Sequence, residues 1–72
     1  MKKVFKLENL DCAHCAGKME EQISKLENVK SASVNFMFQK LTIEAEKEDF
    51  QDILDKSQAI CSGLEKDCVI VR

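Results

Sequence analysis

The chain has 72 residues, which is enough for one small domain with a single modest hydrophobic core. Hydrophobic residues make up 44% and charged residues 33%, a composition that is too apolar for a disordered chain. Eleven basic residues against thirteen acidic ones give a net charge of −2, which argues against a nucleic-acid partner. We therefore expect a single domain over residues 1–72, without a large enclosed substrate cleft.

The sequence contains no candidate for a membrane-spanning helix. Its longest apolar run, Cys68–Val71, is far shorter than the roughly 20 residues that such a helix needs. Lys6 and Glu8 interrupt the apolar residues near the N-terminus, so a signal peptide is not expected. We expect a cytoplasmic monomer, or a cytosolic segment of a larger protein. In that reducing compartment, four cysteines indicate metal or redox chemistry before they indicate disulfides.

The first part of the chain predicts a strand and a helix. Polar and apolar residues alternate over Lys3–Leu7, which is typical of a strand, and Asn9–Ala13 predicts a loop. From His14 to Leu26 the apolar residues recur at steps of three and four, which predicts an amphipathic helix of about three turns. The expected inward residues of this helix are Ala16, Met19, Ile23 and Leu26.

The middle of the chain predicts two more strands. Lys30–Met37 alternates again, with Ala32, Val34 and Phe36 on one face. A tight connection at residues 38–40 then leads into a strand at Leu41–Ala45.

A second helix is expected over Lys47–Ala59, with Ser62 and Gly63 as its C-terminal stop. The β-branched run within Asp67–Val71 predicts a last strand. The inward residues of the second helix are expected to be Phe50, Ile53, Leu54 and Ser57. The order βαββαβ predicts an α+β, ferredoxin-like fold. In that fold a four-stranded antiparallel sheet in the order 4-1-3-2 carries both helices on one face.

The segment Leu10–Ala16 holds two cysteines three positions apart, at the junction of the first strand and the first helix. Cys12 would lie in the loop and Cys15 in the first helical turn, so both sulfurs can converge on one ion. Exposed backbone N–H groups and the helix dipole favour thiolate at this position. Thiolates bind soft ions such as Cu(I) and Zn²⁺. The spacing therefore favours a metal site or a redox site.

This loop, together with Val34–Phe36 and Lys40–Ile43, resembles the heavy-metal-associated domain over nearly the whole chain. The resemblance is strongest to the N-terminal domains of zinc-, cadmium- and lead-exporting P-type ATPases. It implies that Cys12 and Cys15 are ligands and that Asp11 adds a carboxylate. Copper members usually carry Met-Thr or Met-x where this chain has Leu10 and Asp11. Zn²⁺ or Cd²⁺ is therefore the expected ion, with Pb²⁺ possible and Cu⁺ as the alternative. The other interpretation of Asp11 is a loop acid that caps the helix.

Three further residues are weaker candidates. His14 lies between the two cysteines and is expected to face solvent rather than the ion. The topology brings the loop after the second helix to the same end as the first loop, so Cys61 is a candidate additional ligand, ahead of Cys68. The alternatives are that both pack as small hydrophobic residues, or that they form a disulfide under oxidation.

The expected function is that of a metal-binding module and not of an enzyme. The chain would pass one ion on by ligand exchange, as the cytosolic N-terminal domain of a heavy-metal-exporting P-type ATPase. Its partners would be the metal ion and either the membrane domain of the transporter or a metal-donor protein. The alternatives are a stand-alone copper chaperone and a structural zinc domain that uses all four cysteines. A thiol–disulfide oxidoreductase is disfavoured, because thioredoxin-like folds need a cis-proline and this chain has no proline.

Overall fold

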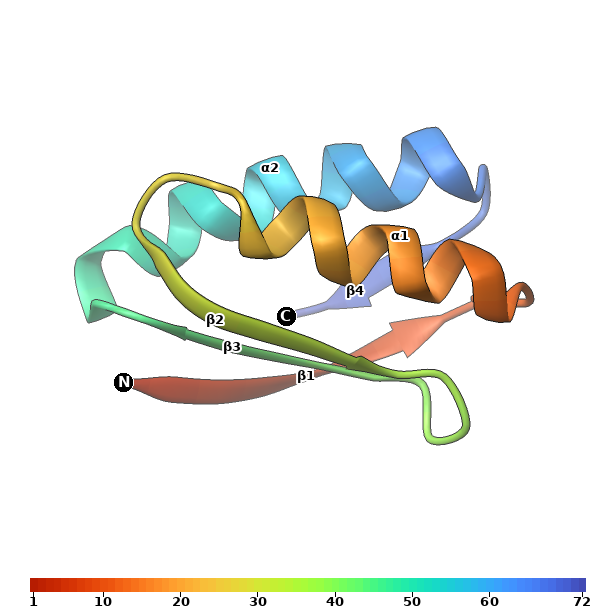
Figure 1. The fold of residues 1–72 in the computed structure, drawn as a ribbon, viewed down its shortest axis with the longest axis horizontal. Helices are drawn as coiled ribbons and strands as arrows, with labels where there is room; N and C mark the ends of the chain where they lie inside the picture. Colours follow the sequence, from red (N-terminus) through yellow and green to blue (C-terminus); the bar gives the residue numbers. More distant parts are fainter.

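The computed structural model describes residues 1–72, and it confirms the βαββαβ order and the ferredoxin-like fold. The elements are β1 (Lys2–Glu8), α1 (Ala13–Ser24), β2 (Val29–Asn35), β3 (Lys40–Ala45), α2 (Phe50–Leu64) and β4 (Val69–Val71), and the short 3-10 turn η1 (Lys47–Asp49) leads into α2. The strands form one antiparallel sheet in the order β2-β3-β1-β4, which is the predicted 4-1-3-2 order. Both helices cover the same face of this sheet (Figure 1). Neither helix has the length and the apolar character that crossing a bilayer requires.

One hydrophobic core lies between the helices and the sheet, and it contains 14 buried residues. Leu7, Leu41 and Ile43 point from the sheet toward the helices, as the alternation predicted. Met19 and Ile23 reach the core from α1 and Ile53 reaches it from α2. Each fully buried aliphatic side chain of this kind contributes roughly 1.5–3 kcal/mol relative to an exposed one. This core therefore gives the fold a source of stability that includes neither Cys12 nor Cys15.

Both helices end at other residues than the sequence predicted. The last residue of α1 is Ser24, and the backbone N–H of Lys25 donates to the carbonyl groups of the preceding turn, so Leu26 lies beyond the helix. The prediction of a helix stop at residues 62–63 was wrong, because α2 continues to Leu64. Gly63 does not adopt a left-handed conformation. Leu64 packs against the core, which accounts for the continuation of α2 through Gly63.

The β2–β3 turn is longer than expected. β2 ends at Asn35, so Phe36 lies in the turn rather than in the strand, although it still packs against the core. The side chain of Asn35 accepts a hydrogen bond of 3.0 Å from the backbone N–H of Phe38. Gln39 closes the turn in a left-handed conformation, with φ of 53°. Alternation alone could not indicate this turn, because Phe36 continues the apolar pattern of the strand.

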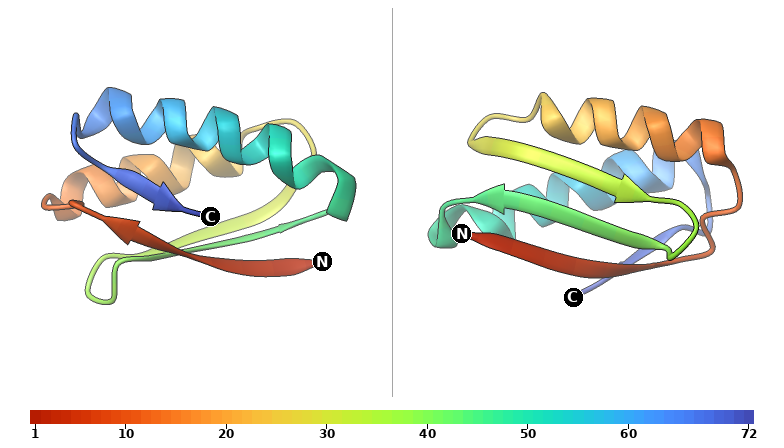
Figure 2. Two further views of the ribbon diagram at one scale, coloured as in Figure 1. Left: turned by 180° about the vertical axis from the view of Figure 1, so that it is seen from behind. Right: turned by 60° about the horizontal axis from the view of Figure 1, so that its bottom comes forward.

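Three connections meet at one end of the sheet: the β1–α1 loop, the β2–β3 turn and the α2–β4 loop (Figures 1 and 2). The Gln39 side chain joins two of them, because it accepts a hydrogen bond of 3.1 Å from the N–H of Leu10 and donates one of 2.8 Å to its carbonyl. The Asn9 side chain joins the third, by donating to the carbonyl of Asp67 at 3.1 Å. These bonds fix the loops around the segment that carries Cys12 and Cys15.

Side chains from the helices occupy both edges of the sheet. Glu20 of α1 accepts a hydrogen bond of 2.8 Å from the backbone N–H of Val34 in β2. Gln58 of α2 accepts one of 2.8 Å from the N–H of Ile70 and donates one of 3.0 Å to the carbonyl of Cys68. Backbone groups that are already bonded cannot pair with an added strand. These bonds leave fewer free backbone groups at the two edges with which an added strand could pair.

Candidate metal centre

The two cysteines of the first loop lie at the start of α1. Cys12 is the N-cap residue in extended conformation, and its Sγ accepts a hydrogen bond of 3.4 Å from the backbone N–H of Cys15. The N–H of Ala16 donates to the Cys12 carbonyl at 3.0 Å, which begins the helix. The sulfur of Cys12 thus accepts the backbone hydrogen bond that the side-chain oxygen of an N-cap residue usually accepts. The interpretation of Asp11 as the helix cap was therefore wrong.

The environment shifts the pKa values of the two thiols in opposite directions. The backbone N–H of Cys15 and then its thiol donate to the Cys12 sulfur, which lowers the pKa of Cys12 below its ordinary value. The same hydrogen bond, followed by burial and by Glu65, raises the pKa of Cys15 to about 11. The Leu64 carbonyl lies 3.9 Å from the Cys15 Sγ and is an alternative acceptor for the single proton of this thiol. The centre therefore offers the more acidic thiol at Cys12 and a thiol that keeps its proton at Cys15.

A carboxylate completes the group. One ligand atom from each of Cys12, Cys15 and Glu65 lies within 4.8 Å of the others, and all three residues are half-buried. Glu65 is the C-cap residue of α2, in extended conformation, and its N–H donates to the Cys61 carbonyl at 2.8 Å. Sequence reasoning missed Glu65. The signal was present, since the topology placed the loop after the second helix at this end, but only its cysteines were considered as ligands.

Asp11 and His14 are both exposed, and neither belongs to the group formed by Cys12, Cys15 and Glu65. The charge of Asp11 acts on Cys68, and there it helps to raise the pKa of that thiol after burial and Glu65. Metal ligation by Asp11 stays a prediction.

Cys61 and Cys68 lie in the core, with 0% and 1% of their surface exposed, and both are free thiols. Burial, reinforced by the neighbouring Cys68, raises the pKa of Cys61 to about 12. Burial also raises the pKa of Cys68. They pack as the small hydrophobic residues that one interpretation expected. They lie outside the three-residue group, and metal binding by Cys61 stays a prediction.

A hollow in the surface lies away from the cysteines. Glu48, Gln51, Asp52 and Asp55 line it, along η1 and the first turns of α2. Two of these acids are already paired, Asp52 with Lys56 at 3.1 Å and Asp55 with Arg72 at 2.7 Å. Exposed carboxylates without an apolar wall do not make a small-molecule site, so the chemistry of this chain is concentrated at the loop end.

Comparison with known proteins identifies the family of the chain. The heavy-metal-associated domain family matches residues 4–60. A copper-exporting P-type ATPase of Bacillus subtilis is 35% identical over 60 residues, which cover 76% of this chain and 8% of that protein. A probable cadmium-transporting ATPase of Staphylococcus aureus is 40% identical over 42 residues, covering 58% and 6%. A cadmium, zinc and cobalt-transporting ATPase of Helicobacter pylori is 37% identical over 49 residues, covering 68% and 7%. The chain thus spans less than a tenth of the length of these relatives.

Solved structures show the same fold. A CopZ metallochaperone aligns with a TM-score of 0.72 at 17% identity, over 99% of this chain and 100% of that one. The N-terminal domain of a potential copper-translocating P-type ATPase from Bacillus subtilis, in its Cu(I)-loaded state, aligns with a TM-score of 0.69 at 30% identity, over 82% and 76%. With the fold, the cysteine loop and the family match in agreement, this chain belongs to the heavy-metal-associated domain family, whose members are metal-binding modules.

Proposed function

We propose that this chain binds one divalent soft ion, Zn²⁺ or Cd²⁺ with Pb²⁺ in the same class, and passes it on by ligand exchange. The observation that carries the proposal is the carboxylate of Glu65 within 4.8 Å of the ligand atoms of Cys12 and Cys15. Carboxylate oxygen is a good ligand for Zn²⁺, whereas Cu(I) prefers thiolate alone. Two thiolates and a carboxylate also bring the site closer to the four ligands that Zn²⁺ takes.

The acidities of the thiols suggest an order of events. The ion would bond first to Cys12, whose lowered pKa favours thiolate. Bonding to Cys15 would then displace a proton to solvent, together with the hydrogen bond that this proton forms. Glu65 would supply the third bond from the other side of the group. Binding is thereby coupled to proton release, and acid would promote release of the ion.

Transfer fits the place of the site in the fold. The three candidate ligands are half-buried at the loop end and not enclosed in the core. With few ligands from the protein, a thiolate from a partner can bond to the ion before the bonds to Cys12 and Cys15 break. A closed structural site with four protein ligands would not allow this.

We propose that the chain serves as a cytosolic domain of a heavy-metal-exporting P-type ATPase, which would contain it as its N-terminal part. Several relatives carry cadmium or cadmium, zinc and cobalt in their names, which supports a divalent ion. Cu⁺ is the second candidate, because a copper-exporting relative is 35% identical and a Cu(I)-loaded domain is 30% identical. Cu⁺ would bond to Cys12 and Cys15 alone, and Glu65 would not be a ligand.

The proposal is tested by titrating Zn²⁺, Cd²⁺ and Cu⁺ into the reduced protein against a competing chelator. Glu65→Gln is expected to weaken Zn²⁺ and Cd²⁺ binding by roughly ten- to a hundredfold and to leave Cu⁺ binding unchanged. Glu8→Gln is the matched control, because Glu8 is an exposed acid outside the three-residue group. Asp11→Asn tests the predicted aspartate ligand in the same assay.

Two results would contradict the proposal. If Glu65→Gln and Glu8→Gln bind the divalent ions as tightly as the wild type, the site works through the cysteines alone and Cu⁺ becomes the better candidate. If chelation of the metal abolishes the circular dichroism of the fold, the site is a structural zinc site. We expect the fold to survive chelation, because its core of 14 buried residues includes neither Cys12 nor Cys15.

A further inference from the structure

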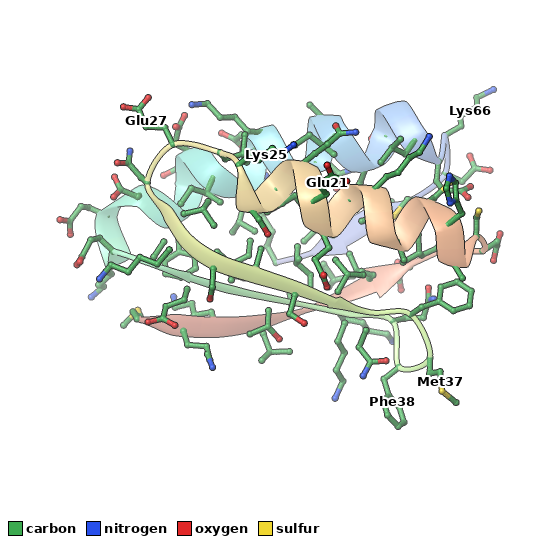
Figure 3. The ribbon with its side chains drawn as sticks, viewed as in Figure 1. Glu21, Lys25, Glu27, Met37, Phe38 and Lys66 are labelled. Atoms are coloured by element: carbon green, nitrogen blue, oxygen red, sulfur yellow. The ribbon has the colours of Figure 1, made fainter.

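Two large apolar side chains project from the β2–β3 turn at the loop end. Met37 is 85% exposed and Phe38 is 69% exposed, more than any other large hydrophobic residue of the chain. Both point away from the body of the molecule (Figure 3). Single exposed apolar residues are normal on a protein surface, but an adjacent pair of this size at a turn forms an apolar patch, of the kind that marks interaction sites.

The turn that carries this pair is stiff. Gln39 holds a left-handed conformation, which costs a non-glycine residue of the order of 1–2 kcal/mol. Its side chain offsets that cost with three hydrogen bonds: it donates to the carbonyl groups of Phe36 at 2.9 Å and Leu10 at 2.8 Å and accepts from the N–H of Leu10 at 3.1 Å. The turn that carries Met37 and Phe38 is thus hydrogen-bonded to Leu10, which lies two positions before Cys12. A preorganised surface loses less entropy when a partner binds.

Basic and acidic side chains lie on different sides of the loop end. Lys6 of β1 lies directly opposite Lys40 of β3, and neither forms an ion pair. Like charges in this position cost stability. On the other side of the cysteines, the α2–β4 loop contributes Glu65, Lys66 and Asp67, and Asp11 of the first loop is close enough to act on Cys68, so the acids outnumber the base there. The end therefore has a basic, apolar side at Lys6, Lys40 and the β2–β3 turn, and a side with a net negative charge at the α2–β4 loop.

We propose that Lys6, Met37, Phe38 and Lys40 form the docking surface for the protein that exchanges metal with Cys12 and Cys15. This inference rests on the proposed function. During ligand exchange, a sulfur of the partner must bond to the ion while the ion is still held by this chain. The partner must then cover the loop end, and the β2–β3 turn, which is bonded to Leu10, lies within that contact.

The charge of the surface specifies the partner as a metal carrier with an acidic loop beside its own thiolates, and we infer that this partner is a second copy of the chain. A second copy of this chain carries such a loop. In a two-fold arrangement about the ion, the basic side of each copy faces the acidic side of the other. A lipid surface fits less well, because acids share this end and the net charge of −2 opposes binding to anionic headgroups.

The test measures metal exchange from two donors. Cadmium-loaded chain is mixed with ¹⁵N-labelled metal-free chain, and the arrival of Cd²⁺ is followed by NMR. In parallel, Cd²⁺ is delivered from its glutathione complex, which needs no docking surface. Phe38→Ser is expected to slow exchange between copies at least tenfold, as loss of a hot spot does, and to leave the glutathione rate within about twofold. Val4→Thr is the matched control, because Val4 is 58% exposed on the open sheet face but lies outside the docking surface.

A second test reverses one charge on each of the two copies. Lys40→Glu is expected to slow exchange between copies, and a donor copy with Asp67→Lys is expected to restore the rate with that variant. The docking surface is refuted if Phe38→Ser exchanges between copies as fast as the wild type, or if it slows both donors alike. It is also refuted if wild-type copies take Cd²⁺ from glutathione but not from each other. Another refuting result is that Phe38→Ser weakens binding of the chain to phosphatidylglycerol vesicles and does not change the exchange rate. Failure of the proposed function looks different, since the wild type would then take Cd²⁺ from neither donor.

Discussion

The unequal acidity of Cys12 and Cys15 makes a quantitative prediction about their reactivity in the metal-free protein. With its pKa raised to about 11, Cys15 is thiolate to roughly one part in 10⁴ at pH 7, whereas Cys12, with its pKa below the ordinary 9.0, exceeds about one part in 10². The thiolate ratio is therefore at least about 100. A less basic thiolate is intrinsically less nucleophilic, by about tenfold over two pKa units. Cys12 should thus react at least about ten times faster than Cys15.

The assay uses a substoichiometric amount of iodoacetamide at pH 7 on the reduced, metal-free protein, with the alkylated residue assigned by tandem mass spectrometry. Cys61 should stay unlabelled until the protein unfolds, because it is fully buried and its pKa is raised to about 12. Cys12→Ser is the informative variant. It removes the partner that contributes most to the raised pKa of Cys15, so Cys15 should react faster in the variant than in the wild type. Equal labelling of Cys12 and Cys15 in the wild type would refute this account of the site.

Three other predictions concern affinity and stability. The apparent affinity for Cd²⁺ should rise about tenfold or more per pH unit between pH 6 and 8, because binding must displace the proton of Cys15; a flat profile in chelator competition would contradict this. Ser57→Ala should raise the free energy of unfolding by about 1 kcal/mol in urea titrations, because the buried Ser57 hydroxyl has no hydrogen-bond partner. Gly17→Ala and Gly63→Ala should each raise it by about 1 kcal/mol, since a Cβ at either helical position meets no atom within 4 Å. A loss of stability in these variants would count against the packing described.

The order of the elements and the inward faces followed from the sequence because each depends on one strong pattern. Alternation places Leu41 and Ile43 in the core, and a helical period does the same for Met19 and Ile23. Those patterns reflect which side chains must leave water, and this requirement dominates the energy of the fold. The strand order 4-1-3-2 then followed from the βαββαβ pattern.

The element ends were predicted less well, because there the competing energies are small. The sequence signal for a stop at Gly63 was weaker than the packing of Leu64 on the core, so α2 continues through Gly63 and ends at Leu64. The conformation of Gln39 depends on hydrogen bonds to Leu10, which is 29 residues away in the chain. No local pattern contains that contact.

The candidate site was predicted in part. The loop position of Cys12 and the helical position of Cys15 followed from their spacing, and the structure confirms both placements. The topology placed the loop after the second helix at the right end, but the position of Glu65 at the end of α2, facing the cysteines, depends on how far that helix extends. The same uncertainty about the end of α2 left Cys61 and Cys68 open as candidates, although both thiols are buried in the core.

The most direct test of the central claim is the cadmium NMR spectrum of the reduced protein loaded with one equivalent of ¹¹³Cd²⁺. The cadmium shift reports how many sulfur atoms bond to the ion. Two sulfurs with oxygen donors are expected, and the signal should move in Glu65→Gln and stay in place in Glu8→Gln. A signal from three or four sulfurs would contradict the account, because it would bring Cys61 or Cys68 out of the core and to the ion.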